Sequence, residues 1–137
     1  MVKVGDVLVP DNLLYSETHQ WAKIENGKVR VGITDYAQKQ LKEIVYVELP
    51  EVGDKVSQGD ELGTIESVKA VAEIYAPVSG TIIEVNNALE DSPEMINSDP
   101  YGEGWMVVIE ASNLDEEKEN LLSAEDYAEL IEKELEK

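Results

Sequence analysis

The stretch from Gly63 to Gly80, GTIESVKAVAEIYAPVSG, constrains the fold most, because it holds two β-prone runs separated by a few polar residues. The runs cover about 60–66 and 70–75, and a proline and a glycine end the second. This pattern predicts a β hairpin with Lys69 at its tip. An amine there is exposed to other proteins. Lysine amines in water are protonated at neutral pH, so we expect a modification site rather than a nucleophile.

The flanking sequence predicts several more short strands. Asn26-Gly27 is a strong signal for a two-residue hairpin turn, and the residues after it alternate between apolar and polar or small. Thr34 can cap a short helix over 36–42. Many short strands with helices at the edges predict a small β sandwich or barrel. Further strands are expected at 44–49, 81–85 and 105–110.

The composition becomes strongly acidic from Asp115 onward. Ser123 is a suitable N-cap, and Tyr127, Ile131 and Leu135 fall on one face of a helix. We expect this helix to pack on the sheet with its acidic face in solvent. The sequence thus predicts one domain over residues 1–137, with a β core at about 15–110 and an acidic helical segment at about 115–137.

The charge balance limits the kinds of partner. The 137 residues include 11 basic and 30 acidic side chains, and the net charge is −19. Nucleic acids and anionic membranes both require a positive surface, so neither is expected as a partner. The N-terminal residues show neither a signal-peptide core nor a basic transit pattern. We therefore expect a cytoplasmic, monomeric protein.

No catalytic constellation is evident in the sequence. There is no cysteine, which excludes thiolate metal sites and thiol nucleophiles. His19 is the single histidine, so neither a zinc site nor a catalytic triad is indicated, and a structural role is expected. Trp21 and Trp105 are assigned to the core. A chain with no metal site, no active site and one presented lysine has the features of a non-catalytic carrier.

The residues around Lys69 also carry a family resemblance. Glu66-Ser67-Val68-Lys69-Ala70 resembles the lipoylation motif of the H protein of the glycine cleavage system. Other blocks match that family in the same order, and together they cover roughly residues 15–109. These blocks are His19 with Trp21, 31–34, 36–38, 45–50, 75–80, 84–86, Asn97, 99–101 and 104–105.

The resemblance implies a fold and a cofactor. The fold is expected to be mainly β, a lipoyl-type barrel–sandwich hybrid with short helices, including C-terminal helices. Lys69 would be linked through an amide to lipoic acid. The hairpin residues recognised with it would be Glu66, Ser67, Val68 and Ala70.

The resemblance also implies a set of partner enzymes. A lipoyl ligase or transferase would attach the lipoyl group. A pyridoxal-phosphate glycine decarboxylase would load the aminomethyl group of glycine onto the arm, and an aminomethyltransferase would pass it to tetrahydrofolate. A dihydrolipoyl dehydrogenase using FAD and NAD would reoxidise the arm. The chain would thus be the lipoyl carrier protein of glycine cleavage.

In this family the loaded arm rests in a cleft, and the matching residues here are Thr18, His19, Gln20 and Glu73. Gln20 departs from the family, which usually has Glu between the His and the Trp. Because an amide lacks the charge of a carboxylate, we expect weaker shielding of the loaded group unless Glu17 or Glu73 compensates.

The chain departs from the family at a second position as well. Lys42 replaces the glycine that the family commonly has after Leu41. We expect this replacement to change only the local structure at the end of the helix.

Three other functions remain open from the sequence. Biotin carriers share the hairpin lysine but flank it with methionines, where this chain has Val68 and Ala70. A lipoyl relay that supplies other dehydrogenase complexes would use the same motif as a glycine cleavage carrier. An acidic structural scaffold with an incidental lysine would make Lys69 dispensable.

Overall fold

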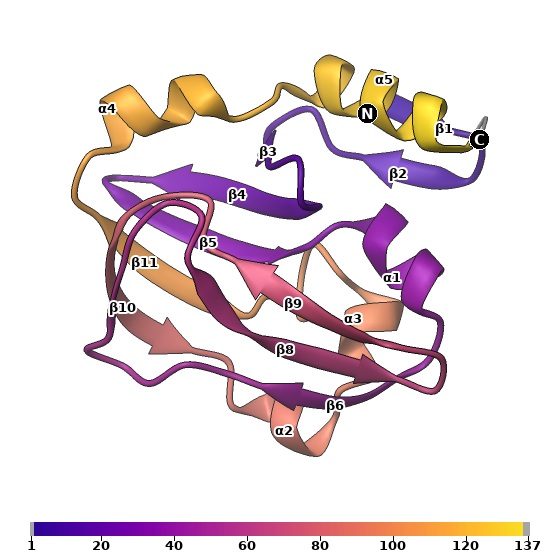
Figure 1. Ribbon diagram of the computed structural model, residues 1–137, viewed down its shortest axis with the longest axis horizontal. Helices are drawn as coiled ribbons and strands as arrows, with labels where there is room; N and C mark the ends of the chain where they lie inside the picture. Colours follow the sequence, from indigo (N-terminus) through magenta and orange to yellow (C-terminus); the bar gives the residue numbers. More distant parts are fainter. Residues whose placement is uncertain (1, 136–137) are drawn as a thin grey trace.

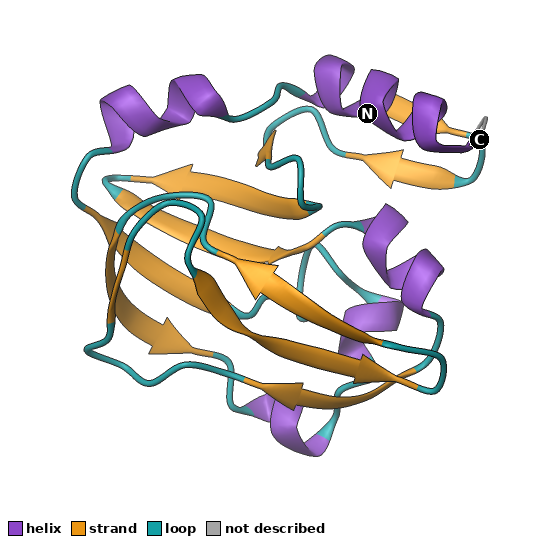
Figure 2. Ribbon diagram, viewed as in Figure 1, coloured by secondary structure: helices purple, strands orange, loops and turns teal. Residues whose placement is uncertain are grey.

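The computed structural model describes residues 2–135, which form a mainly β fold with short helices (Figures 1 and 2). This confirms the class predicted from the sequence. The strands are β1 (Val2–Val4), β2 (Val7–Val9), β3 (Leu14–Tyr15), β4 (Gln20–Glu25), β5 (Lys28–Ile33), β6 (Ile44–Glu48), β7 (Lys55–Val56), β8 (Glu61–Ser67), β9 (Val71–Tyr75), β10 (Gly80–Val85) and β11 (Val107–Ala111). The helices are α1 (Asp35–Leu41), α2 (Ala88–Asp91), α3 (Met95–Ser98), α4 (Leu114–Glu117), the 3-10 turn η1 (Lys118–Asn120) and α5 (Ala124–Leu135).

Two antiparallel sheets enclose the main core. One has the strand order β3-β4-β5-β11-β10-β7, and the other has the order β6-β8-β9. Alternate side chains of the two sheets point inward and exclude water, as the period-2 pattern requires. Val31 and Ile109 reach this core from the first sheet, and Val47, Ile65 and Ile74 reach it from the second.

The hairpin predicted at Asn26-Gly27 is present. Glu25 pairs with Lys28 across a two-residue loop that joins β4 to β5. Both loop residues have positive φ, 49° at Asn26 and 79° at Gly27, as a type I′ turn requires. Local turn chemistry was therefore sufficient to predict this register.

A second, smaller core lies outside the main one, where the N- and C-terminal segments meet. The β1–β2 hairpin, which the sequence did not predict, packs against α5 (Figure 1). The Tyr15 and Tyr127 rings stack there, with centroids 4.6 Å apart. Helix α5 packs on β3, the edge strand of the six-stranded sheet, as expected, and the β1–β2 hairpin also packs on its apolar face. Leu135, at the end of the helix, remains 50% exposed.

Helix α1 begins as predicted, since the Thr34 hydroxyl accepts from the Ala37 N–H at 3.2 Å. Its other end is strained. Lys42 has φ 71° and ψ −145°, a backbone conformation adopted almost only by glycine. Asn97, in α3, holds this end by donating to the Lys42 carbonyl at 2.7 Å.

Replacing Lys42 with glycine should stabilise the protein. The Lys42→Gly change relieves the backbone strain but makes the unfolded chain more flexible. The net gain in the free energy of unfolding should be about 1 kcal/mol. Urea denaturation measures the free energy of unfolding. The Lys42→Ala variant is the control, because alanine keeps the Cβ and should give no gain. An equal gain in both variants would contradict the strain at this position.

Candidate functional site

Lys69 lies at the tip of the β8–β9 hairpin, where the sequence predicted it. It is exposed, in the short connection between Ser67 and Val71. The hydroxyl of Ser67 accepts from the backbone N–H of Lys69 at 3.1 Å and of Ala70 at 3.0 Å. The Ser67 N–H also donates to the Ala70 carbonyl at 2.8 Å. These bonds order the turn while leaving the lysine side chain free to project.

The tip is also attached to the end of α1. The Val68 N–H donates to the Glu43 carbonyl at 3.0 Å, and the Lys69 ammonium group donates to the Gln40 carbonyl at 3.4 Å. The strained turn at Lys42 lies between these two carbonyls in sequence. The position of the lysine therefore depends on the local structure at the end of α1.

The surface around the tip is unusually apolar for so charged a chain. Val68 and Val71 flank the lysine with 65% and 64% of their surface exposed, and Val45 and Tyr46 extend the apolar surface along β6. Glu66, also exposed, pairs with both Tyr46 and Val71 across the sheet. Of the residues expected to be recognised with Lys69, Glu66, Val68 and Ala70 are thus exposed, and Ser67 is half-buried.

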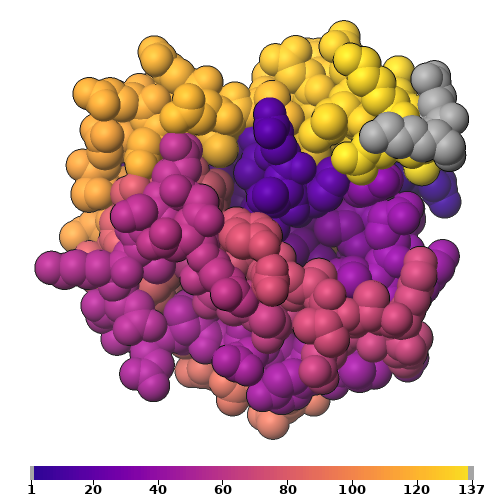
Figure 3. All heavy atoms as spheres, in the orientation of Figure 1, coloured from indigo at the N-terminus to yellow at the C-terminus, as the bar shows by residue number. Residues whose placement is uncertain are grey.

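A cavity of about 300 Å³ opens beside this hairpin. The surface is hollowed between the yellow C-terminal helix and the pink strand β9 (Figure 3). All four residues predicted for a cleft line it, so the fold brings them together from two distant segments. The apolar lining residues are Ile33, Ala37, Leu41, Ile65, Ala72 and Ile74; the polar ones are Thr18, His19, Gln20, Tyr36, Gln40, Glu73 and Glu134.

Gln20 is buried, with 2% of its surface exposed, and its amide is already engaged. Its Oε1 atom accepts from the hydroxyls of Ser16, at 2.8 Å, and of Thr18. Its Nε2 atom donates to the Thr18 carbonyl at 2.9 Å. Both lone pairs of the oxygen are occupied, so this side chain has little capacity left for a ligand.

Only one of the two acids expected to compensate for Gln20 lines this cavity. Glu73 does so, exposed on β9, and accepts from the Tyr75 hydroxyl at 2.6 Å. Glu17 lines a different cavity, with Gln58 and Tyr75. Glu17 is therefore not among the residues that line the cavity beside the hairpin.

Glu134 is a lining residue that sequence reasoning missed. It is carried by the last turn of α5, and its Oε2 atom accepts from the Tyr36 hydroxyl at 2.9 Å. The available signal was its spacing, because residue 134 lies three positions after Ile131, on the buried face of the helix. In so acidic a tail, that single carboxylate was indistinguishable from its solvated neighbours.

His19 connects the cavity to α5. Its Nδ1 atom is 2.8 Å from the Tyr127 hydroxyl, and its Nε2 atom is 3.5 Å from the carboxylate of Glu134. Burial lowers the pKa of His19 below its usual 6.5, against the opposing effect of the Glu134 charge. The structural role expected for this histidine agrees with these contacts.

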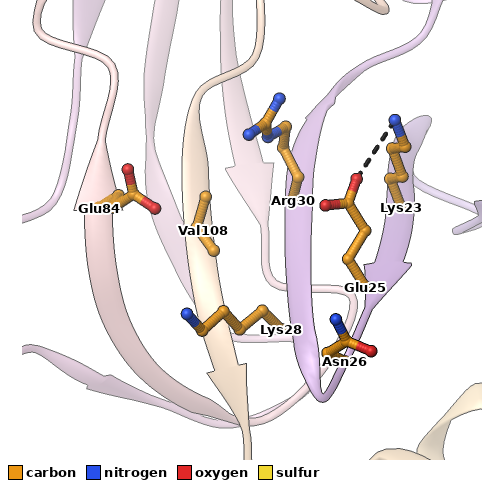
Figure 4. A pocket seen from close by; sticks show the side chains of 7 residues that line it. All are labelled: Lys23, Glu25, Asn26, Lys28, Arg30, Glu84 and Val108. Carbon is orange, nitrogen blue, oxygen red and sulfur yellow. Dashed lines mark ion pairs between the residues drawn. The ribbon is translucent and has the colours of Figure 1, made fainter.

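A second cavity of about 270 Å³ lies on the outer face of the six-stranded sheet (Figure 4). Lys23, Lys28 and Arg30 line it together with two glutamates, and Lys23 pairs with Glu25 at 3.2 Å. The Arg30 guanidinium lies 5.1 Å from the ring centre of Trp105. Trp105 is only partly buried, so its assignment to the core was incomplete. Mixed charges on a solvated sheet face account for this cavity without a ligand.

Two further properties hold for the part of the chain between residues 2 and 135. No group of three or more His, Asp or Glu side chains there is placed to hold a metal ion. None of the helices in that range has the length and apolar character needed to cross a bilayer.

Two packed antiparallel sheets that present one hairpin tip beside a cavity form the lipoyl-type barrel–sandwich hybrid. The family model described as glycine cleavage H-protein matches residues 13–134. The chain therefore belongs to the glycine cleavage H-protein family.

Similar proteins support the same assignment. A probable glycine cleavage system H protein of Thermococcus gammatolerans is 58% identical over 133 residues, covering 96% of this chain and 98% of that protein. The glycine cleavage system H protein of Oceanobacillus iheyensis is 54% identical, covering 90% of this chain and 97% of that one. A crystal structure of a glycine cleavage system H protein from Mycobacterium marinum superposes with a TM-score of 0.79 at 40% identity, covering 88% and 97% of the two chains.

The lowered pKa of His19 predicts a pH-dependent contribution to stability. Below pH 6.5 the unfolded histidine binds a proton before the folded one does, so the contribution of His19 falls as the pH decreases. The His19→Asn variant keeps a residue that tolerates the positive φ of 73° at this position. The difference in unfolding free energy, wild type minus variant, should shrink between about pH 7.5 and about pH 5. Parallel pH profiles would contradict the burial of a neutral imidazole.

Proposed function

We propose that this chain is the lipoyl carrier protein of the glycine cleavage system, with lipoic acid attached through an amide to Lys69. One observation carries the proposal. The Lys69 ammonium group sits at an ordered, exposed tip and contacts the carbonyl of Gln40, a residue that lines the 300 Å³ cavity. An arm on this lysine can therefore extend to a partner enzyme or fold back into the protein.

The cavity suits such an arm. Amide formation removes the charge of the lysine, and the resulting aliphatic chain is compatible with the apolar part of the lining, which includes Leu41, Ile65 and Ile74. The volume lies at the lower end of the range for small-molecule sites, which fits one slender chain. The polar rim, with Thr18 and Glu73, is suited to an amine at its end. When bound, the dithiolane supplies the redox and group-carrying chemistry.

The chain itself contributes presentation and shelter rather than catalysis. Ser67 and Glu43 hold the hairpin tip, so the reach of the arm is measured from a defined point. Tethering keeps the carried group at a high effective concentration beside any enzyme that docks on the hairpin. The exposed apolar side chains of Val68 and Val71 provide a surface that such an enzyme can bury.

Membership in the family indicates that the protein works with the enzymes of glycine cleavage. We propose as partners a pyridoxal-phosphate glycine decarboxylase, a tetrahydrofolate-dependent aminomethyltransferase and an FAD- and NAD-dependent dihydrolipoyl dehydrogenase. A lipoyl ligase or transferase would modify Lys69. The aminomethyl group of glycine would travel on the arm from the decarboxylase to the aminomethyltransferase.

The attachment site can be tested by intact mass. Incubation with a lipoyl ligase, ATP and lipoate should add one lipoyl group to the wild type and none to Lys69→Ala. Lys55→Ala is the matched control, because Lys55 is also exposed but lies on β7. It should be modified like the wild type. Modification of Lys69→Ala, or none of the wild type, would refute Lys69 as the site.

The carrier role requires a second measurement. Glycine decarboxylase and glycine should load the lipoylated protein, and aminomethyltransferase with tetrahydrofolate should unload it, both detected as mass changes. A protein that accepts lipoate but is never loaded would instead act as a lipoyl relay.

Gln20→Glu tests how well the cavity protects the carried group. A carboxylate makes charge-assisted hydrogen bonds about twice as strong as neutral ones, so the variant should release ammonia and formaldehyde more slowly once loaded. It should also lose about 1 kcal/mol of stability, because the donor to the Thr18 carbonyl is removed. Equal release rates in the two proteins would show that Gln20 does not limit the protection.

A further inference from the structure

The charge of the cavity comes from two carboxylates, Glu73 and Glu134. Gln20, which occupies the position where the family usually has a glutamate, is neutral, and its Oε1 atom already accepts two hydrogen bonds. Glu73 and Glu134 are therefore the two lining side chains that can neutralise a cation in the cavity.

The two glutamates are not equivalent. Glu73 is exposed on β9, so water and salt screen its charge, and the Tyr75 hydroxyl occupies its Oε2 atom. The side chain of Glu134 is 31% exposed and lies against the partly buried ring of His19. Its attraction for a cation is therefore screened less. Each carboxylate accepts a tyrosine hydroxyl at Oε2, and among residues 2–135 neither Oε1 atom has a hydrogen-bond partner, so exposure rather than acceptor capacity distinguishes the two.

A series of hydrogen bonds orients the His19 ring beside Glu134. The Thr34 Oγ1 atom accepts from Ala37 and lies 2.7 Å from the Tyr127 hydroxyl, so its own hydrogen can be donated to Tyr127. Tyr127 can in turn donate to Nδ1 of His19, 2.8 Å away. In that tautomer the hydrogen of the neutral imidazole is on Nε2, the nitrogen nearest Glu134. A hydrogen on Nε2 avoids repulsion between a lone pair of that nitrogen and the carboxylate oxygen of Glu134.

Tyr36 completes the support from the other side. Its hydroxyl donates to Glu134 at 2.9 Å, and burial together with this bond raises the pKa of Tyr36, so it stays a donor. The carboxylate is thus positioned by groups on α1 and on the loop before β4, while α5 carries it. A side chain supported in this way loses little freedom when it binds a ligand.

We infer that Glu134 is the carboxylate that binds the cationic amine of the group carried on Lys69, in place of the glutamate that Gln20 replaces. This inference rests on the proposed function, because it requires an arm on Lys69 that reaches the cavity. It assigns a binding role to the C-terminal helix, whose acidic residues otherwise face solvent.

A stable mimic of the carried group makes the test direct. The chain has no cysteine, so after reduction the arm of the lipoylated protein carries the only thiols. Alkylation with 2-bromoethylamine forms thioethers with loss of bromide and leaves a cationic amine on each sulfur. Alkylation with 1-bromopropane gives arms of the same length without the charge. The ratio of docked to free arm can be followed by amide NMR shifts of Ala37 and Ala72, which line the cavity.

We expect the aminoethyl arm to dock more strongly than the propyl arm in the wild type, with a difference that decreases as salt is added. Glu134→Gln should lower the docked-to-free ratio of the aminoethyl arm on the order of ten-fold, as for one lost charge-assisted hydrogen bond. Tyr36→Phe should cause a smaller loss. Glu132→Gln removes a charge from the same turn at an exposed position and is the matched control.

The outcomes separate this inference from the proposed function. If the aminoethyl preference survives in Glu134→Gln, or is lost equally in Glu132→Gln, the assignment of Glu134 is overturned. Loss of the preference in Glu73→Gln alone would assign the role to Glu73 and also overturn it. If neither arm shifts Ala37 and Ala72 in the lipoylated wild type, the arm does not use the cavity and the assignment of Glu134 is overturned, whereas the proposed carrier function stands or falls on the mass and loading measurements.

Discussion

The hydroxyl of Tyr127 is the contact on which the functional half of the structure depends. It bonds to His19 and Thr34, and so joins the C-terminal helix to the loop before β4 and to the start of α1. These three segments bound the cavity, together with β8 and β9. The stacked ring of Tyr15 fixes Tyr127 from the side of the second core. Because the groups are buried, losing one of these bonds would leave a partner unsatisfied, which costs more than the bond itself contributes.

The hairpin tip depends on the other end of α1. The carbonyls of Gln40 and Glu43 accept from the tip, and the strained residue Lys42 lies between them in sequence. A single short helix therefore contributes both to the wall of the cavity and to the support of Lys69. Under the proposed function, this arrangement would let the protein control where an arm on Lys69 rests.

Much of the candidate site could be predicted from local sequence. Three local features depend on residues only a few positions apart and can be recognised from the sequence alone: the turn at Asn26-Gly27, the Thr34 cap and the hairpin around Lys69. The β1–β2 hairpin was missed because its strands are three residues long, too short for a periodic signal. Helices α2 and α3, with four residues each, were missed for the same reason.

The sequence by itself determined most strands of the two main sheets, the exposed lysine and the family, because these follow from short-range patterns and matching blocks. The tertiary structure alone decided which acids line the cavity beside Lys69. In a chain with 30 acidic residues, the sequence does not show which carboxylates belong to a site, because only packing distinguishes a partly buried carboxylate from an exposed one. Folding brings Glu134 from the C-terminal helix to the cavity and places Glu17 elsewhere, since long-range contacts set both positions.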